Sequence, residues 1–146
     1  MKNTALVLML FLAVTASCNQ NTTKTKNSEA QTTAAAVSPT DATVVNVFYF
    51  HGKQRCTTCI AVGNVAKATV GKAFADNSKV VFTEVNTSEA AAKALVEKYG
   101  VTWNALIIAK GDDAVDITQQ AFATAIANPQ SLEQLIKAEV NKRLAN

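Results

Sequence analysis

Residues 44–50 are β-branched or aromatic at every position except Asn46, with little alternation of apolar and polar residues. Apolar residues without alternation are typical of a strand buried on both faces of a sheet. From Cys56 onward the spacing changes to that of an amphipathic helix, which we expect to end near Asp76. Its predicted buried face comprises Val62, Val65, Ala66, Thr69, Val70 and Ala73.

The next part of the chain repeats the strand-and-helix alternation. Residues 79–85 predict a second strand, and Asn86 followed by Glu89 resembles a capping box at the start of a second helix. Gly100 suits the position just after that helix. Residues 103–109 predict a third strand, followed by a turn and a short antiparallel return strand over 114–118.

Asn128 followed by Pro129 predicts the start of the final helix, because asparagine is a common N-cap and proline is favoured at the first helical position. Leu132, Leu135, Ile136, Val140 and Leu144 then recur at helical spacing. The predicted order is strand, helix, strand, helix, strand, strand, helix. It indicates an α/β domain with a central, mostly parallel sheet and a C-terminal β-hairpin, flanked by helices.

The first forty residues have a different character. A short positive start and an apolar run over 5–14 have the length of a secretory signal and are too short to span a bilayer, which needs ~20 apolar residues. The segment ending at Cys18 resembles the lipobox of bacterial lipoproteins, which implies lipidation of Cys18. Ordinary cleavage after Ala16, leaving a free thiol, is the alternative.

We therefore expect three regions: a lipoprotein signal peptide over 1–17, a lipid anchor and disordered, flexible tether over 18–42, and one domain over 43–146. The formal net charge is +3, from 14 basic and 11 acidic residues. No basic block or aromatic pattern concentrates this charge, so we expect no nucleic acid partner.

Two of the three cysteines, Cys56 and Cys59, form a Cys-x-x-Cys pair between the first predicted strand and helix. A cysteine at a helix N-terminus is stabilised as a thiolate by unpaired N–H groups. Lys53 and Arg55, in the preceding loop, act in the same direction. We expect Cys56 to attack a disulfide and Cys59 to resolve the mixed disulfide.

Three other interpretations of the pair remain open. A purely structural disulfide would close so short a loop that it removes only roughly 2 kcal/mol of unfolded-state entropy. A metal or metalloid site, for Cu(I) or As(III), would use Cys56, Cys59 and His51, the only histidine. The two cysteines could also be ordinary buried residues.

Further candidate residues flank the pair. His51 could modulate the redox chemistry or satisfy a backbone group. Trp103, Asn104 and Ala105 open the third predicted strand, and we expect them to line a groove for a partner. Trp103 could equally belong to the core.

The segment from Phe50 to Cys59, with Tyr99-Gly100-Val101, resembles the thioredoxin-like superfamily over about residues 43–145. More narrowly, Tyr49 to Gly52 and Arg55 to Cys59 resemble small envelope proteins of the nitrophenyl compound nitroreductase subunit ArsF family. The pattern departs from thioredoxins: Thr57-Thr58 separate the cysteines, and Asn104 stands where thioredoxins have a cis-proline. Both reductant and oxidant roles stay open.

The resemblance implies an envelope thiol-disulfide oxidoreductase or thiol electron carrier, facing the periplasm and anchored by lipid. Its expected partner is a thiol or disulfide protein, with a membrane electron donor as one candidate. No Gly-x-Gly-x-x-Gly motif is present, so we expect no flavin, nicotinamide or other cofactor.

Overall fold

A computed structural model describes residues 42–146. The signal predicted for 1–17, the lipidated Cys18 and nearly all of the predicted tether lie outside the described residues. Within residues 42–146, no helix has both the length and the hydropathy needed to cross a bilayer.

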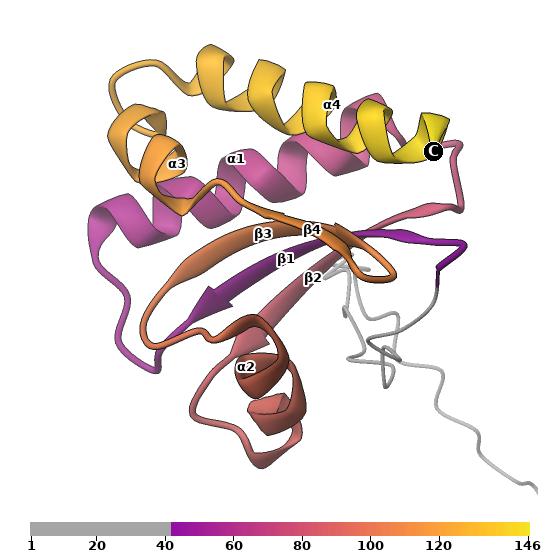
Figure 1. The fold of residues 1–146 in the computed structure, drawn as a ribbon. Coiled ribbons are helices and arrows are strands. Elements are labelled where there is room, and N and C mark those ends of the chain that lie inside the picture. Colours follow the sequence, from indigo (N-terminus) through magenta and orange to yellow (C-terminus); the bar gives the residue numbers. More distant parts are fainter. Residues whose placement is uncertain (1–41) are drawn as a thin grey trace, which may run out of the picture. The chain divides into compact units, whose positions relative to one another are not determined.

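The described part is an α/β domain with a four-stranded mixed sheet (Figure 1). In the sheet the strands lie in the order β2-β1-β3-β4. Along the chain the elements are β1 Val45–His51, α1 Thr57–Ala73, β2 Val80–Asn86, the 3-10 helix η1 Ala90–Ala92, α2 Lys93–Tyr99, β3 Ala105–Lys110, β4 Asp113–Asp116, α3 Thr118–Thr124 and α4 Pro129–Ala145.

The prediction of a mostly parallel sheet is wrong, because only β1 and β2 pair in parallel. β3 runs antiparallel to both β1 and β4, and the pairing of β3 with β4 confirms the predicted hairpin. The length of the connections explains the difference. The 17-residue α1 carries the chain back along the sheet, whereas the seven-residue α2 is only about 10 Å long. β3 therefore starts beside the carboxyl end of β1, where Ala105 pairs with Phe50.

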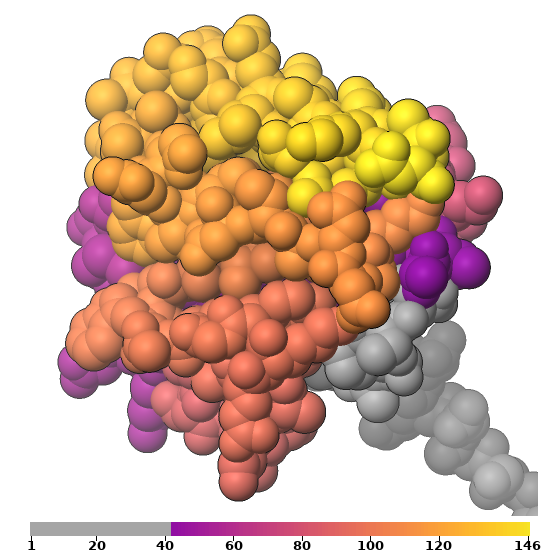
Figure 2. Space-filling view, in the orientation of Figure 1, coloured from indigo at the N-terminus to yellow at the C-terminus, as the bar shows by residue number. Residues whose placement is uncertain are grey.

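Helices cover both faces of this sheet (Figure 1). In the space-filling view, the atoms of α4 lie along the top of the domain, coloured yellow (Figure 2). On one face, Val45, Val47 and Tyr49 of β1 pack in a cluster with α1, α3 and α4. On the other, Phe48 and Phe50 pack with residues of η1 and α2. Because side chains alternate along a strand, this two-sided burial explains why most positions of β1 are apolar.

Local details confirm some sequence expectations and correct others. Gly100 ends α2 with a φ of 61°, which glycine adopts without steric cost, and the Asn128 side chain caps α4 by accepting from Ser131 N. Asn86 is not an N-cap: it is the last residue of β2, and its side chain bonds to Glu89 in a turn before η1. The sequence did not predict α3. Ala73, which we expected on the buried face of the first helix, is exposed.

Candidate functional site

The two cysteines of the Cys-x-x-Cys pair lie where the connection from β1 enters α1. Cys56 is the N-cap of α1 and is exposed, whereas Cys59 is only 4% exposed. Their sulfur atoms lie at disulfide distance, and their Cα atoms are 5.0 Å apart. An incoming group therefore reaches Cys56 first, while Cys59 is shielded one turn further along.

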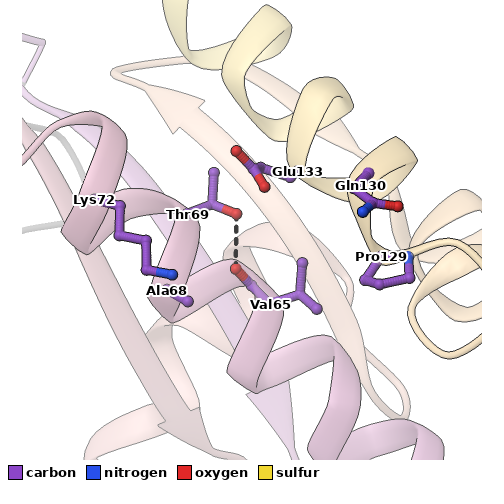
Figure 3. A pocket seen from close by; sticks show the side chains of 7 residues that line it. All are labelled: Val65, Ala68, Thr69, Lys72, Pro129, Gln130 and Glu133. Atoms are coloured by element: carbon purple, nitrogen blue, oxygen red, sulfur yellow. Dashed lines mark hydrogen bonds between the residues drawn. The ribbon is translucent and has the colours of Figure 1, made fainter.

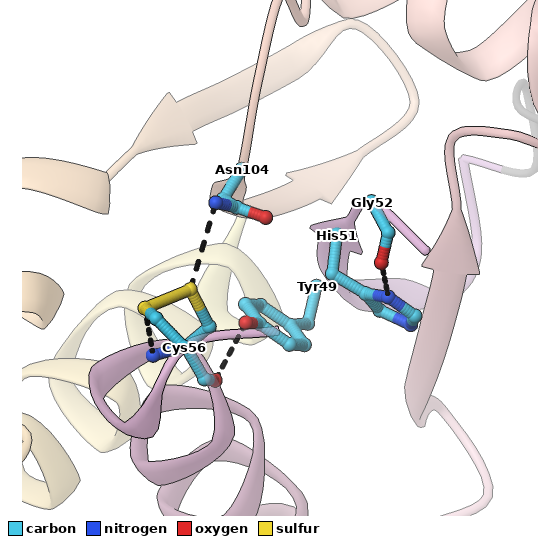
Figure 4. The surroundings of a disulfide bond; sticks show 6 residues. Tyr49, His51, Gly52, Cys56 and Asn104 are labelled. Atoms are coloured by element: carbon cyan, nitrogen blue, oxygen red, sulfur yellow. Dashed lines mark hydrogen bonds between the residues drawn. A yellow bond between two sulfur atoms is a disulfide. The ribbon is translucent and has the colours of Figure 1, made fainter. Parts of the chain in front are cut away.

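Each sulfur atom has its own N–H donor (Figure 4). The backbone N–H of Cys59 donates to Cys56 Sγ over 3.2 Å. The side-chain amide of Asn104 donates to Cys59 Sγ over 3.7 Å from the segment before β3. Hydrogen bonds from neutral donors stabilise a sulfur anion, so both positions can support a thiolate once the disulfide is reduced.

Tyr49 of β1 lies beneath the first turn of α1 and is fully buried. Its hydroxyl donates to the Cys59 carbonyl over 2.6 Å, which ties β1 to the disulfide (Figure 4). Burial raises the pKa of Tyr49 above its usual value, while the neighbouring Arg55 acts in the lowering direction. The raised pKa keeps the hydroxyl protonated, so it remains a donor.

Arg55 directly precedes Cys56, the expected nucleophile, and contacts residues of β1 and β2. Its guanidinium lies 5.3 Å from the centre of the Tyr49 ring and forms an ion pair with Glu84 of β2. Glu84 Oε1 also lies 3.3 Å from His51 Nε2, and His51 Nδ1 lies 2.8 Å from the Gly52 carbonyl oxygen. These contacts fix the cation beside the entrance to α1.

His51 is therefore engaged away from the two sulfur atoms. Both of its ring nitrogens face oxygen acceptors, and in residues 42–146 no three His, Cys, Asp or Glu side chains converge as a metal site would require. The alternative site built from Cys56, Cys59 and His51 does not assemble in this arrangement. A metal or metalloid would meet the two cysteines alone.

Trp103 is 80% exposed, which excludes its assignment to the core. It borders a hollow of about 430 Å³ whose lining is Gly52, Lys53, Gln54, Thr87, Thr102, Trp103 and Asn104. The predicted groove residues Trp103 and Asn104 and the predicted modulator Lys53 thus meet at one place. Ala105 does not line the hollow, because it is buried in the cluster with Phe50.

A second hollow, of about 250 Å³, lies between α1 and the start of α4 (Figure 3). Its lining is Val65, Ala68, Thr69, Lys72, Pro129, Gln130 and Glu133. The Thr69 hydroxyl donates to the Val65 carbonyl and is satisfied within the helix. None of the residues around the disulfide contributes to this hollow.

The sequence prediction did not include Tyr49, Glu84 or Gly63 among the site residues. A Cβ on Gly63 would lie 2.7 Å from Arg55 Nη2 and 2.8 Å from Tyr49 Cε1, so glycine permits their close approach. Glu84 left a signal in the sequence, because it is the one charged residue of β2. Its partner Arg55 is 29 positions away, and only the β1–β2 pairing brings them together.

Comparison of the sequence with protein-family models and with curated proteins gives no match.

Proposed function

We propose that this chain is an envelope thiol-disulfide oxidoreductase or thiol electron carrier with a thioredoxin-like fold. The observation that carries the proposal is the disulfide between exposed Cys56 and buried Cys59 at the start of α1. A strand, a short loop and a helix that begins at a Cys-x-x-Cys pair support the thioredoxin-like assignment. The four-stranded mixed sheet with helices on both faces is compatible with it.

The proposed cycle uses the difference between the two sulfur atoms. In the reduced protein, the Cys56 thiolate attacks a partner's disulfide and forms a mixed disulfide, releasing one partner thiolate. Cys59 then attacks Cys56 Sγ, restoring the Cys56–Cys59 bond and releasing the second partner thiolate. Two electrons pass from the protein to the partner, and the reverse sequence reduces the protein.

The proposed location is the bacterial envelope, with a lipid on Cys18 holding the domain on the periplasmic side of a membrane. The lipobox-like segment before Cys18 supports this part of the proposal. The partner is a protein with a thiol or disulfide, and the resemblance to the ArsF family favours electron delivery to another subunit. No cofactor enters the proposed reaction.

The test is the reduction potential of the Cys56–Cys59 pair in the full chain, by thiol trapping in glutathione buffers. A Cys18→Ser background leaves only this pair to titrate. We expect one two-electron transition between about −120 and −270 mV, the range of thiol oxidoreductases. Cys56→Ser or Cys59→Ser should abolish it.

Two results would contradict the proposal. One is a pair of thiols that never forms the intramolecular disulfide in any of these buffers. The other is a pair that resists alkylation until a chelator is added, which would favour binding of a metal such as Cu(I) by the two cysteines.

A further inference from the structure

The hollow beside the disulfide is lined by residues that carry charge of one sign only. Lys53 is its only charged lining residue, and the others are threonines, side-chain amides, a glycine and Trp103. Lys53 is exposed and forms no ion pair with any residue of the described range. Arg55, two positions later, is already paired with Glu84. The hollow therefore offers an uncompensated ammonium group to an anion.

This hollow adjoins the redox pair through Asn104 and the loop before Cys56. Asn104 belongs to its lining and also donates to Cys59 Sγ. Lys53 and Gln54 line it from the loop that leads to Cys56. Neither cysteine is part of the lining, so a ligand with a carboxylate at Lys53 must extend out of the hollow along this loop for its sulfur atom to meet Cys56. The exposed ring of Trp103 offers a flat apolar surface to the carbon chain between them.

The volume of the hollow, about 430 Å³, falls within the roughly 300–1,000 Å³ common for small-molecule sites. We propose that it binds low-molecular-weight thiols and disulfides that carry a carboxylate, with the carboxylate at Lys53 and the reacting sulfur at Cys56. This proposal rests on the proposed function and names a substrate class for it.

The reaction with such a disulfide, R–S–S–R, is balanced. The Cys56 thiolate bonds to one sulfur and the S–S bond breaks, which releases one R–S⁻. Cys59 loses its proton to solvent and attacks Cys56 Sγ, which releases the second R–S⁻. The protein dithiol is oxidised by two electrons and the small disulfide is reduced by two. In reverse, two small thiolates reduce the protein disulfide.

Binding is tested separately from redox chemistry, because Trp103 is the only tryptophan in the chain. The probe is 3-(methylthio)propionate, whose thioether cannot exchange, added to the full-length disulfide form. We expect a saturable change in Trp103 emission that is lost in Lys53→Gln and retained in Lys67→Gln, a charge-matched control on the exposed side of α1. The uncharged 3-(methylthio)propanol should give no saturable change.

Substrate preference is tested with the reduced full-length protein and two disulfides of similar size, 3,3′-dithiodipropionate and bis(2-hydroxyethyl) disulfide. We expect the ratio of their rate constants, anionic over neutral, to fall about threefold in Lys53→Gln at low salt, as befits an exposed ion pair. The fall should shrink at 1 M salt, where charges are screened beyond about 3 Å.

An equal fall in Lys67→Gln would overturn the proposal, because it would show only attraction by net charge. A Trp103 response that is the same in Lys53→Gln as in the wild type would also overturn it. Exchange with neither disulfide would overturn the proposed substrate class. The proposed redox function would then stand or fall by its own test, the two-electron titration of the Cys56–Cys59 pair.

Discussion

At the scale of single residues, the two cysteines of the disulfide differ in solvent exposure and in the group that donates a hydrogen bond to each sulfur atom. Cys56 is exposed and receives a backbone N–H, whereas Cys59 is buried and receives the Asn104 amide. When a thiolate attacks Cys56, Cys59 leaves as a buried anion, which is costly without a donor. Asn104 supplies that donor from a segment 45 positions away.

Replacement of Asn104 should therefore slow reduction of the disulfide. Asn104→Ala removes the donor and should lower the rate of reduction by dithiothreitol about fivefold, since a hydrogen bond contributes about 1 kcal/mol. Asn104→Asp places a negative charge there and should lower it at least tenfold. Thr102→Ala on the same segment is the control. A wild-type rate in Asn104→Asp would refute this role.

Gly63 offers a test of the packing below the disulfide. Gly63→Ala places a methyl group against Arg55 and the buried Tyr49 ring, so it should destabilise the fold by about 1–3 kcal/mol. Gly71 is the matched control on the same helix, with nothing within 4 Å of an added Cβ. Gly71→Ala should stabilise by about 0.5–1 kcal/mol, the usual helical advantage of alanine. Urea unfolding measures both, and equal effects would contradict the close approach.

At the scale of elements, the site depends on β1 and its two neighbours. β1 carries Tyr49 and His51, β2 carries Glu84, and the segment before β3 carries Asn104. All of them meet near the carboxyl end of β1, because β2 ends there and β3 begins there. The antiparallel course of β3, which sequence analysis missed, is what brings Asn104 to Cys59.

α3 was missed because its apolar signal is weak. Ile117, Ala121 and Ala125 are buried at a spacing of four, but two of them are alanines, which bury little surface. Asp116 accepts from the Thr118 N–H at its start. The seven-residue helix gains stability from the cluster it joins rather than from its own sequence.

The contribution of the Asn128 N-cap to stability can be tested by substitution at the start of α4. The Asn128 side chain accepts from the Ser131 N–H over 3.2 Å, and the same N–H also donates to the Asn128 carbonyl over 3.0 Å. Asn128→Ala should lower the free energy of unfolding by about 1 kcal/mol. Asn64→Ala, at an exposed position within α1, should leave it unchanged or raise it slightly. Thermal or urea unfolding would show whether the two differ.

At the scale of the whole domain, the last turn of α4 is fastened to the β3–β4 hairpin. Arg143 is 3% exposed and pairs with Asp113 of β4 at 3.0 Å and with Glu139 at 2.7 Å. A buried guanidinium needs such partners, since an unpaired charge in the interior is strongly unfavourable. The contacts join the C-terminal helix to the β3–β4 hairpin on the face of the sheet that α1, α3 and α4 cover.

Asp113→Asn should therefore destabilise the domain by about 1–2 kcal/mol, below the value for a fully buried pair, because Asp113 is half exposed. The neighbouring Asp112→Asn is the control, and we expect no measurable change from it because Asp112 is fully exposed. Urea unfolding at neutral pH makes the comparison. Equal stability of the two variants would contradict the role of Arg143 as a fastening point.

The sequence by itself determined the features that depend on neighbouring residues: the buried β1, the start of α1 at Cys56, the Gly100 end of α2, the Asn128 cap and the Cys56–Cys59 pair. These follow from local periodicity, capping and spacing. Tertiary structure alone decided the direction of β3, the exposure of Trp103, the Arg55–Glu84 pair and the contact of Asn104 with Cys59. Each of these depends on which segments pair across the sheet, and residue spacing along the chain carries no record of that choice.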